Sequence, residues 1–163
     1  MTAPHYEYRP ASMADLALLT GWLAQPHVRA WWDATVPFDA SSLHDPRVAR
    51  WIVSLNGRPF AYLQDYAVHG WDDHHFAGMP AASRGIDRYI GEPDMIGRGH
   101  GTAFIAARME GLFADGAPMI ATDPHPDNAR AIAVYRKLGF AEAGPPQDTR
   151  WGRILPMNAK RTG

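Results

Sequence analysis

Three glycines alternate with other residues in the segment Gly97-Arg98-Gly99-His100-Gly101-Thr102, which follows a strand-like run and opens a helical one. Glycine lets backbone N–H groups approach an anion without obstruction by side chains. A helix N-terminus adds unpaired donors and the positive end of the helix dipole, and Arg98 adds a full positive charge. The segment therefore predicts a cradle for pyrophosphate, although a glycine-rich loop built only for tight packing has the same composition.

Two other phosphate-binding loops do not fit this segment. A Walker loop needs a Lys-Ser/Thr pair after its last glycine, and the segment has none. The dinucleotide fingerprint needs the spacing Gly-x-Gly-x-x-Gly, whereas these glycines are spaced Gly-x-Gly-x-Gly.

A second pattern lies further along the chain, where Asn128 precedes Tyr135 by seven positions and Gly139-Phe140 follows. Seven residues are about two helical turns, so both side chains lie on one face of a helix. Taken singly, Asn128 is explained as a helix N-cap and Tyr135 as a core aromatic. Both alternatives remain open at this point.

The two patterns together resemble the GNAT N-acetyltransferases, whose acetyl-CoA loop reads Gln/Arg-x-x-Gly-x-Gly/Ala. That pattern falls on Ile96 to Gly101, and Ile96 departs from it at the first position. In this family the Asn contacts the pantetheine arm and the Tyr protonates the departing thiolate. The resemblance implies that acetyl-CoA contacts Arg88, Tyr89, Ile90, Gly97, Arg98, Gly99, His100, Gly101, Thr102, Asn128 and Tyr135.

Further segments are similar to the branch that contains aminoglycoside 6'-N-acetyltransferases and siderophore-type lysine N-acyltransferases. They are Trp31-Trp32, Asn56-Gly57-x-Pro59, Gln64-Asp65-Tyr66, Gly85-Ile86-Asp87 and Asp123-Pro124. The siderophore enzymes tend to have His at the third position of the Gly-Ile-Asp segment, so Asp87 favours the antibiotic-modifying enzymes.

Acyl transfer to an amine needs a base for the ammonium proton, a polarised thioester carbonyl and an acid for the thiolate. The resemblance assigns these roles to Asp87, to the main-chain N–H of Arg88 or Tyr89, and to Tyr135. A polycationic substrate also calls for an acidic cleft. The residues expected to bind substrate are Trp31, Trp32, Gln64, Asp65, Tyr66, Asp72, Asp73, Asp87 and Asp123, with Trp71 as a further flat wall.

Composition excludes several classes of protein. A net charge of -1 gives no reason to expect nucleic acid or an anionic membrane as partner, and no run is apolar enough to span a bilayer. Without cysteine there is no thiolate nucleophile, and no Gly-x-Ser-x-Gly is present. Adjacent His74 and His75 would point apart on an extended backbone, so we expect no metal site. We expect a cytoplasmic protein, monomeric or homodimeric.

The elements that must position these residues follow from hydrophobic spacing, turns and caps. Strands are expected at 6–9, 48–55, 59–68, 85–90 and 118–122, with a final hairpin of 140–143 and 151–157. Helices are expected after the Ser12 N-cap, over 27–32, over a stripe of Ile105, Met109, Leu112 and Phe113, and over 128–138; loops are expected at 34–46 and 69–84.

This order predicts one α/β (α+β) domain over residues 1–163, with the GNAT fold. Its mixed central sheet would have about six to seven strands, with helices on both faces.

Three functions stay open at this stage. The first is acetyl-CoA-dependent acetylation of an aminoglycoside 6'-amine by direct transfer in a ternary complex. The second is transfer to another small amine, such as a lysine-derived siderophore precursor. The third is a CoA-binding module without catalysis.

Overall fold

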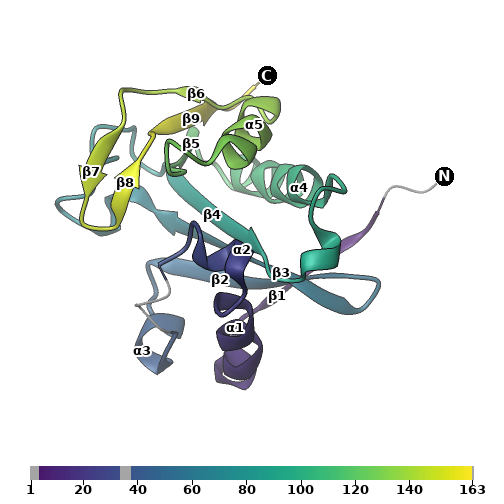
Figure 1. The fold of residues 1–163 in the computed structure, drawn as a ribbon. Coiled ribbons are helices and arrows are strands. Elements are labelled where there is room, and N and C mark those ends of the chain that lie inside the picture. Colours follow the sequence, from purple (N-terminus) through teal and green to yellow (C-terminus); the bar gives the residue numbers. More distant parts are fainter. Residues whose placement is uncertain (1–3, 34–37, 163) are drawn as a thin grey trace. The chain divides into compact units, whose positions relative to one another are not determined.

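The computed structural model describes residues 4–33 and 38–162. Seven strands pair in the order β1-β2-β3-β4-β5-β9-β6, and β7 and β8 form a separate two-stranded sheet (Figure 1). Because β4–β5 is parallel whereas β1–β2 and β5–β9 are antiparallel, the sheet is mixed. The predicted α/β class with a mixed sheet of about six to seven strands is confirmed.

The chain groups into two units, which are described separately. The N-terminal unit comprises Met1–Gln64 and Arg88–His100, and the C-terminal unit comprises Asp65–Asp87 and Gly101–Gly163. Strands β3 and β4 each contribute residues to both.

The N-terminal unit contains β1 (Tyr6–Pro10), α1 (Leu16–Leu23), α2 (Pro26–Arg29), α3 (Ala40–Leu43), β2 (Val48–Leu55), most of β3 (Arg58–Ala67) and the end of β4 (Arg84–Ile90). The C-terminal unit contains the rest of β3 and β4 and all of α4 (His100–Ala114) except His100. It also contains β5 (Met119–Thr122), α5 (Ala129–Lys137), β6 (Ala141–Glu142), β7 (Gln147–Thr149), β8 (Gly152–Ile154) and β9 (Met157–Lys160). Short 3-10 turns cover Met13–Asp15, Val68–Gly70 and Pro93–Met95.

In the N-terminal unit, a capping box starts the first helical segment as predicted. The Ser12 side chain accepts from the Ala14 N–H, and the Asp15 side chain accepts from the Ser12 N–H. Reciprocal caps of this kind satisfy donors that a helix leaves unpaired. The core of this unit consists of apolar side chains of α1 to α3 and of three strands, namely Leu19, Trp22, Leu23, Val28, Phe38, Leu43, Ile52, Tyr62 and Tyr89.

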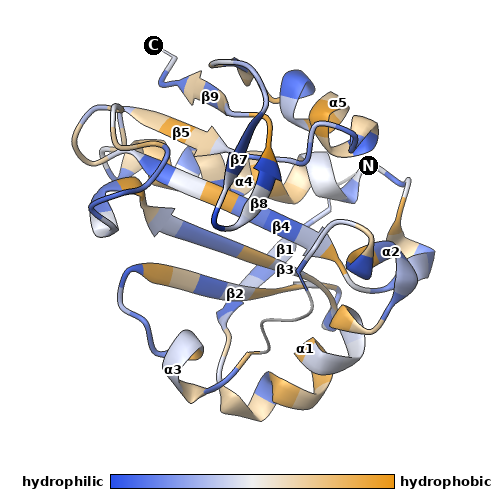
Figure 2. Ribbon diagram, turned by 60° about the vertical axis from the view of Figure 1, so that its left-hand side comes forward, coloured by the Kyte–Doolittle hydropathy of each residue, from blue (hydrophilic) through white to orange (hydrophobic). Residues whose placement is uncertain are grey.

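In the C-terminal unit, α4 buries one stripe of apolar residues. Phe104, Ile105, Met109 and Leu112 are buried, whereas Phe113, which was predicted in this stripe, is only half-buried. Strand β5 is largely hydrophobic along its length (Figure 2). Such a strand suits the interior of a sheet, between β4 and β9.

Three predictions of local structure were wrong in detail. The helix expected over 27–32 is only α2 (Pro26–Arg29). The loop expected over 34–46 contains α3, because Asp39 and Ser42 form a second capping box; residues 34–37 of that prediction lie outside the described part of the chain. The final hairpin forms only at one end: Glu142 of β6 pairs with Met157 of β9, while Gly152–Ile154 (β8) pairs with β7 instead.

Candidate active site

Two carboxylates in the C-terminal unit stand where strands β4 and β5 stop pairing. The parallel register joins Arg84 to Ile120 and Gly85 to Ala121. Continued by two residues, the same register places Asp87 opposite Asp123. Ligands of sheets with parallel strands bind at the carboxyl ends of those strands. Asp123 lies at such an end, directly after β5, and Asp87 lies next to it although it is in the middle of β4.

The two carboxyl groups form a hydrogen bond to each other. Such a bond requires a proton on one partner, because two ionised carboxylates repel. The Asp123 side chain is only 15% exposed. Burial raises the pKa of Asp123 to about 6, while the hydrogen bond from Asp87 opposes this rise.

Tyr66, which extends β3 into this unit, lies beside the two carboxylates. Burial is the main cause that raises the pKa of the Tyr66 phenol, and the charges of Asp123 and Asp87 add to it. The Tyr66 ring fills the space over Gly85, where any Cβ would overlap it. Gly85 of the Gly-Ile-Asp segment therefore has to be glycine, because Tyr66 of the Gln-Asp-Tyr segment occupies the space of a side chain.

The face of α5 carries the second predicted pair. The Asn128 side chain accepts from the Ala131 N–H at 3.2 Å and caps the helix. Tyr135 is 4% exposed and packs on Phe140, with ring centroids 5.3 Å apart. Tyr135 also contributes to the raised pKa of Tyr66, so its phenol interacts electrostatically with the tyrosine that lies beside the two carboxylates. Asn128 is therefore a helix cap and Tyr135 a core aromatic. Neither of these roles excludes the predicted contact with the cofactor.

Sequence reasoning missed a histidine at this site. His75 Nε2 lies 2.9 Å from Asp123 Oδ2, across 48 positions of the chain. The His74 and His75 rings stack at 4.2 Å, because the loop is not extended, so the expectation that they point apart was wrong. The sequence contains no signal for the Asp123 contact, since loop 69–84 has no regular structure from which to infer it.

The predicted acidic cleft is only partly supported. Asp65 is fully buried, and its two oxygens accept from Arg84 at 2.6 Å and Arg108 at 2.9 Å. With both oxygens occupied, Asp65 is part of a buried ion triad, and we leave it out of the proposed substrate site. Asp73 is exposed and pairs with Arg150 at 3.0 Å.

Other predicted substrate residues of this unit lie on the loop before β4. Asp72 is exposed. Trp71 packs against Tyr66 at 5.7 Å and against Trp151 of the β7–β8 turn at 6.2 Å. This aromatic group adjoins the carboxylates through Tyr66.

The glycine loop of the N-terminal unit has the conformation that its composition indicates. Gly97 and Gly99 have φ values of 75° and 81°, which only glycine adopts at little cost. Gly97, Arg98 and Gly99 are exposed, whereas His100 Nδ1 is hydrogen-bonded to the Tyr6 hydroxyl at 2.8 Å. In the C-terminal unit, Gly101 and Thr102 continue the loop into the first turn of the 15-residue α4. The loop and helix can present amides to an anion.

The remaining predicted residues belong to the N-terminal unit. Tyr89 stacks on Tyr62 with centroids 5.2 Å apart, and half-buried Trp32 meets both edge to face. Trp31 is 49% exposed. Gln64 accepts hydrogen bonds from Arg50 and Tyr62. The side chains of Arg88 and Ile90 are half-buried, and the Ile90 carbonyl is bonded to His27 Nε2 at 2.7 Å.

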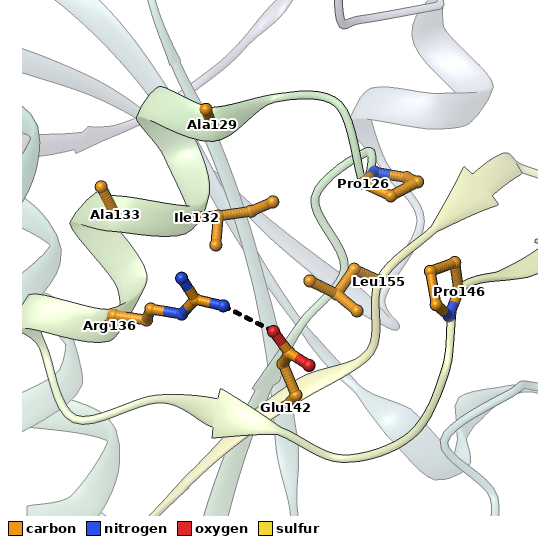
Figure 3. A pocket seen from close by; sticks show the side chains of 8 residues that line it. All are labelled: Pro126, Ala129, Ile132, Ala133, Arg136, Glu142, Pro146 and Leu155. Carbon is orange, nitrogen blue, oxygen red and sulfur yellow. Dashed lines mark hydrogen bonds and ion pairs between the residues drawn. The ribbon is translucent and has the colours of Figure 1, made fainter.

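A groove of about 400 Å³ lies along the other side of α5 (Figure 3). An ion pair between Arg136 and Glu142 crosses it at 2.5 Å. Its lining residues are Pro126, Ala129, Ile132, Ala133, Arg136, Glu142, Pro146 and Leu155. None was predicted for the site, so the groove does not coincide with the carboxylate pair.

Among residues 4–33 and 38–162, no group of three or more His, Cys, Asp and Glu side chains is arranged to hold a metal ion. Over the same residues, none of the helices is both long and apolar enough to cross a membrane.

A mixed sheet whose β4 and β5 separate after two pairs, followed by a glycine loop and helix, is the architecture of an acyl-CoA-dependent transferase. Residues 11–147 match the family described as acetyltransferase (GNAT) domain, and the chain belongs to that family.

The relatives narrow this class. The chain is 35% identical over 146 residues to aminoglycoside N(6')-acetyltransferase type 1 of Klebsiella pneumoniae, covering 80% of this chain and 71% of the relative. It is similar to the crystal structure of aminoglycoside acetyltransferase AAC(6')-Ib with coenzyme A and kanamycin, at a TM-score of 0.84, 33% identity and coverage of 96% and 95%. AAC(6')-Ib in complex with paromomycin and acetyl-CoA has the same TM-score of 0.84 and 33% identity, with coverage of 96% and 93%.

Proposed function

We propose that this chain is an acetyl-CoA-dependent aminoglycoside 6'-N-acetyltransferase. The observation that carries the proposal is the hydrogen-bonded pair of Asp87, in the middle of β4, and Asp123, directly after β5. A buried pair of carboxylates with one shared proton is suited to an ammonium group. Relatives at 33–35% identity that act on or bind aminoglycosides support this choice of amine.

Asp87 is the proposed base. Asp87 first takes the proton of the substrate ammonium, directly or through water. The neutral nitrogen then attacks the thioester carbonyl carbon and loses its second proton to water. Asp123 stays beside Asp87 and holds a positive charge of the substrate. Tyr135 gives its phenolic proton to the sulfur as the C–S bond breaks, and it regains a proton from solvent. This sequence of steps is direct transfer without an acyl-enzyme.

The proposed cofactor residues hold acetyl-CoA through the main chain. Amides of Gly97 to Thr102 and the charge of Arg98 bind the pyrophosphate. The N–H of Arg88 or Tyr89 polarises the thioester carbonyl, Ile90 contacts the cofactor next to them, and Asn128 contacts the pantetheine arm. Removal of one donor to such a carbonyl costs roughly 3 kcal/mol in other enzymes.

Release of thiol from acetyl-CoA tests the function directly. We expect turnover with kanamycin and tobramycin, little with lysine derivatives, and an acetyl group on the 6'-nitrogen by NMR of the product. Turnover of lysine derivatives alone would indicate the siderophore-type reaction. Binding of CoA by calorimetry without turnover of any amine would indicate a non-catalytic module.

The base is tested with Asp87→Asn, and exposed Asp115→Asn serves as control. We expect kcat to fall about 10²- to 10⁴-fold for Asp87→Asn with unchanged affinity for acetyl-CoA, as for loss of a general base. Equal losses in kcat and in cofactor affinity would remove Asp87 from the catalytic role.

The proposal also covers the domain organisation, the location and the partners of the chain. We propose one acetyltransferase domain over residues 1–163, acting in the cytoplasm as monomer or homodimer. Its partners are acetyl-CoA and a small polycationic amine, without nucleic acid, membrane or metal.

A further inference from the structure

His75 is a buried imidazole that the proposed reaction does not use. Its side chain is 6% exposed, and Nε2 lies 2.9 Å from Asp123 Oδ2. Above its pKa of about 6 the Asp123 side chain is ionised and its Oδ2 can only accept, so Nε2 carries the hydrogen and donates it to Asp123. The carboxylate thereby selects one tautomer of the neutral ring.

The other ring nitrogen points into buried space. His75 Nδ1 is buried and has no hydrogen-bond partner among residues 4–33 and 38–162. In the selected tautomer this atom is an acceptor with a free lone pair. A buried acceptor is stabilised only when a donor reaches it. A ligand that enters beside Asp123 can supply that donor.

Aromatic side chains hold the imidazole in this orientation. The ring of His74 stacks on it at 4.2 Å, Phe76 lies at 4.4 Å, and Trp151 of the β7–β8 turn lies at 5.6 Å. Trp151 itself is 46% exposed, so solvent reaches the group of aromatic rings around His75 on the side of Trp151. The lone pair of Nδ1 therefore has a fixed direction.

The charge state of His75 fits an acceptor. Burial lowers the pKa of His75, and only the charge of Asp87 raises it again. The groups that face the ring are Asp123 from the end of β5, Asp87 from β4 and His74 from its own loop, and burial lowers the pKa of His74 to about 4. At neutral pH the ring is uncharged, and it accepts rather than donates at Nδ1.

We infer that His75 binds the aminoglycoside by accepting a hydrogen bond at Nδ1 from one of its ammonium or hydroxyl groups, while Nε2 positions Asp123. This inference rests on the proposed function and adds a residue to its substrate site. Asp87 and Asp123 then bind the positive charge of the substrate, and His75 accepts a hydrogen bond from a substrate donor in one fixed direction.

Two substitutions separate the two nitrogens. His75→Gln places an amide donor near the position of Nε2 and leaves no acceptor at Nδ1. His75→Asn places a carbonyl near the position of Nδ1 and does not reach Asp123. We expect His75→Gln to raise KM for kanamycin about 10- to 100-fold with kcat within a few-fold, as for loss of a hydrogen bond to a charged donor. We expect His75→Asn, which keeps an acceptor near Nδ1, to raise KM for kanamycin less than His75→Gln does.

Nitrogen NMR of the full chain with labelled histidine provides a readout apart from activity. The His75 Nδ1 resonance, assigned by its loss in His75→Gln, should move when kanamycin is added. It should stay in place when acetyl-CoA alone is added. Exposed His44→Gln serves as control and should change neither KM nor the His75 resonance.

The outcomes separate this inference from the proposed function. If the wild type turns over kanamycin while His75→Gln has an unchanged KM and the Nδ1 resonance does not move, the role of His75 is refuted and the function stands. If the wild type turns over no aminoglycoside, the function fails, and the inference fails with it.

Discussion

Asp123→Asn should make the folded protein more stable at neutral pH and less active. Burial raises the pKa of Asp123 from 3.8 to about 6 in the folded chain. Because the folded-state pKa is the higher one, the folded protein holds this proton more tightly than the unfolded chain. The stability that the proton provides is complete below about pH 3.8 and is lost as the pH rises through about 6.

The magnitude follows from these two values. At 1.36 kcal/mol for each pKa unit, the difference between 3.8 and about 6 corresponds to about 3 kcal/mol of lost stability above pH 6. Asparagine carries no charge, and its carbonyl can still accept from His75 Nε2. The substitution should therefore recover up to about 3 kcal/mol, which in a chain of this size raises Tm by about 6–12 °C.

The assay is urea denaturation of wild type and Asp123→Asn at a series of pH values from about 4.5 to 8. The difference in the free energy of unfolding should grow with pH and level off above about pH 6.5, while turnover of kanamycin falls in the variant. The control is Asp127→Asn, because the Asp127 side chain is 82% exposed. A difference that is the same at every pH, or one that favours the wild type at pH 8, would refute the reasoning.

Three further predictions concern other parts of the molecule. Gly99→Ala should weaken acetyl-CoA binding about tenfold by calorimetry because φ is 81°, whereas Gly116→Ala, with φ of 105° after α4, should lower stability and leave that affinity unchanged. Tyr135→Phe should lower kcat about 100-fold with unchanged acetyl-CoA affinity, and loss of both together would contradict its role as acid. Asp65→Asn should lower the free energy of unfolding by about 3–5 kcal/mol because it removes a fully buried negative charge that pairs with Arg84 and Arg108, whereas Asp94→Asn, in an exposed pair, should change it little in the same denaturation assay.

The sequence by itself determined the elements whose causes are local. Strand β2 has the predicted bounds Val48–Leu55, and the Asn56-Gly57 turn has positive φ at both residues. The cap at Asn128 and the end of α5 before Gly139 also follow the prediction. Caps, turns and apolar periods depend on residues a few positions apart, so they can be predicted from short stretches of the sequence. The positive φ values of Gly97 and Gly99 have the same local cause, whereas Asp87 was proposed from the resemblance to a family.

The tertiary structure decided what each charged side chain meets. Asp65 and Asp123 are both acids next to strands in the sequence, yet one is neutralised by Arg84 and Arg108 and the other stands beside Asp87 and His75. The partner of β6 likewise is β9, which includes only Met157 of the expected segment 151–157. These contacts join residues far apart in sequence, and burial and pairing at such distances depend on how the strands are ordered and registered. No local pattern records that, and for this reason nothing in the sequence indicated the contact between His75 and Asp123.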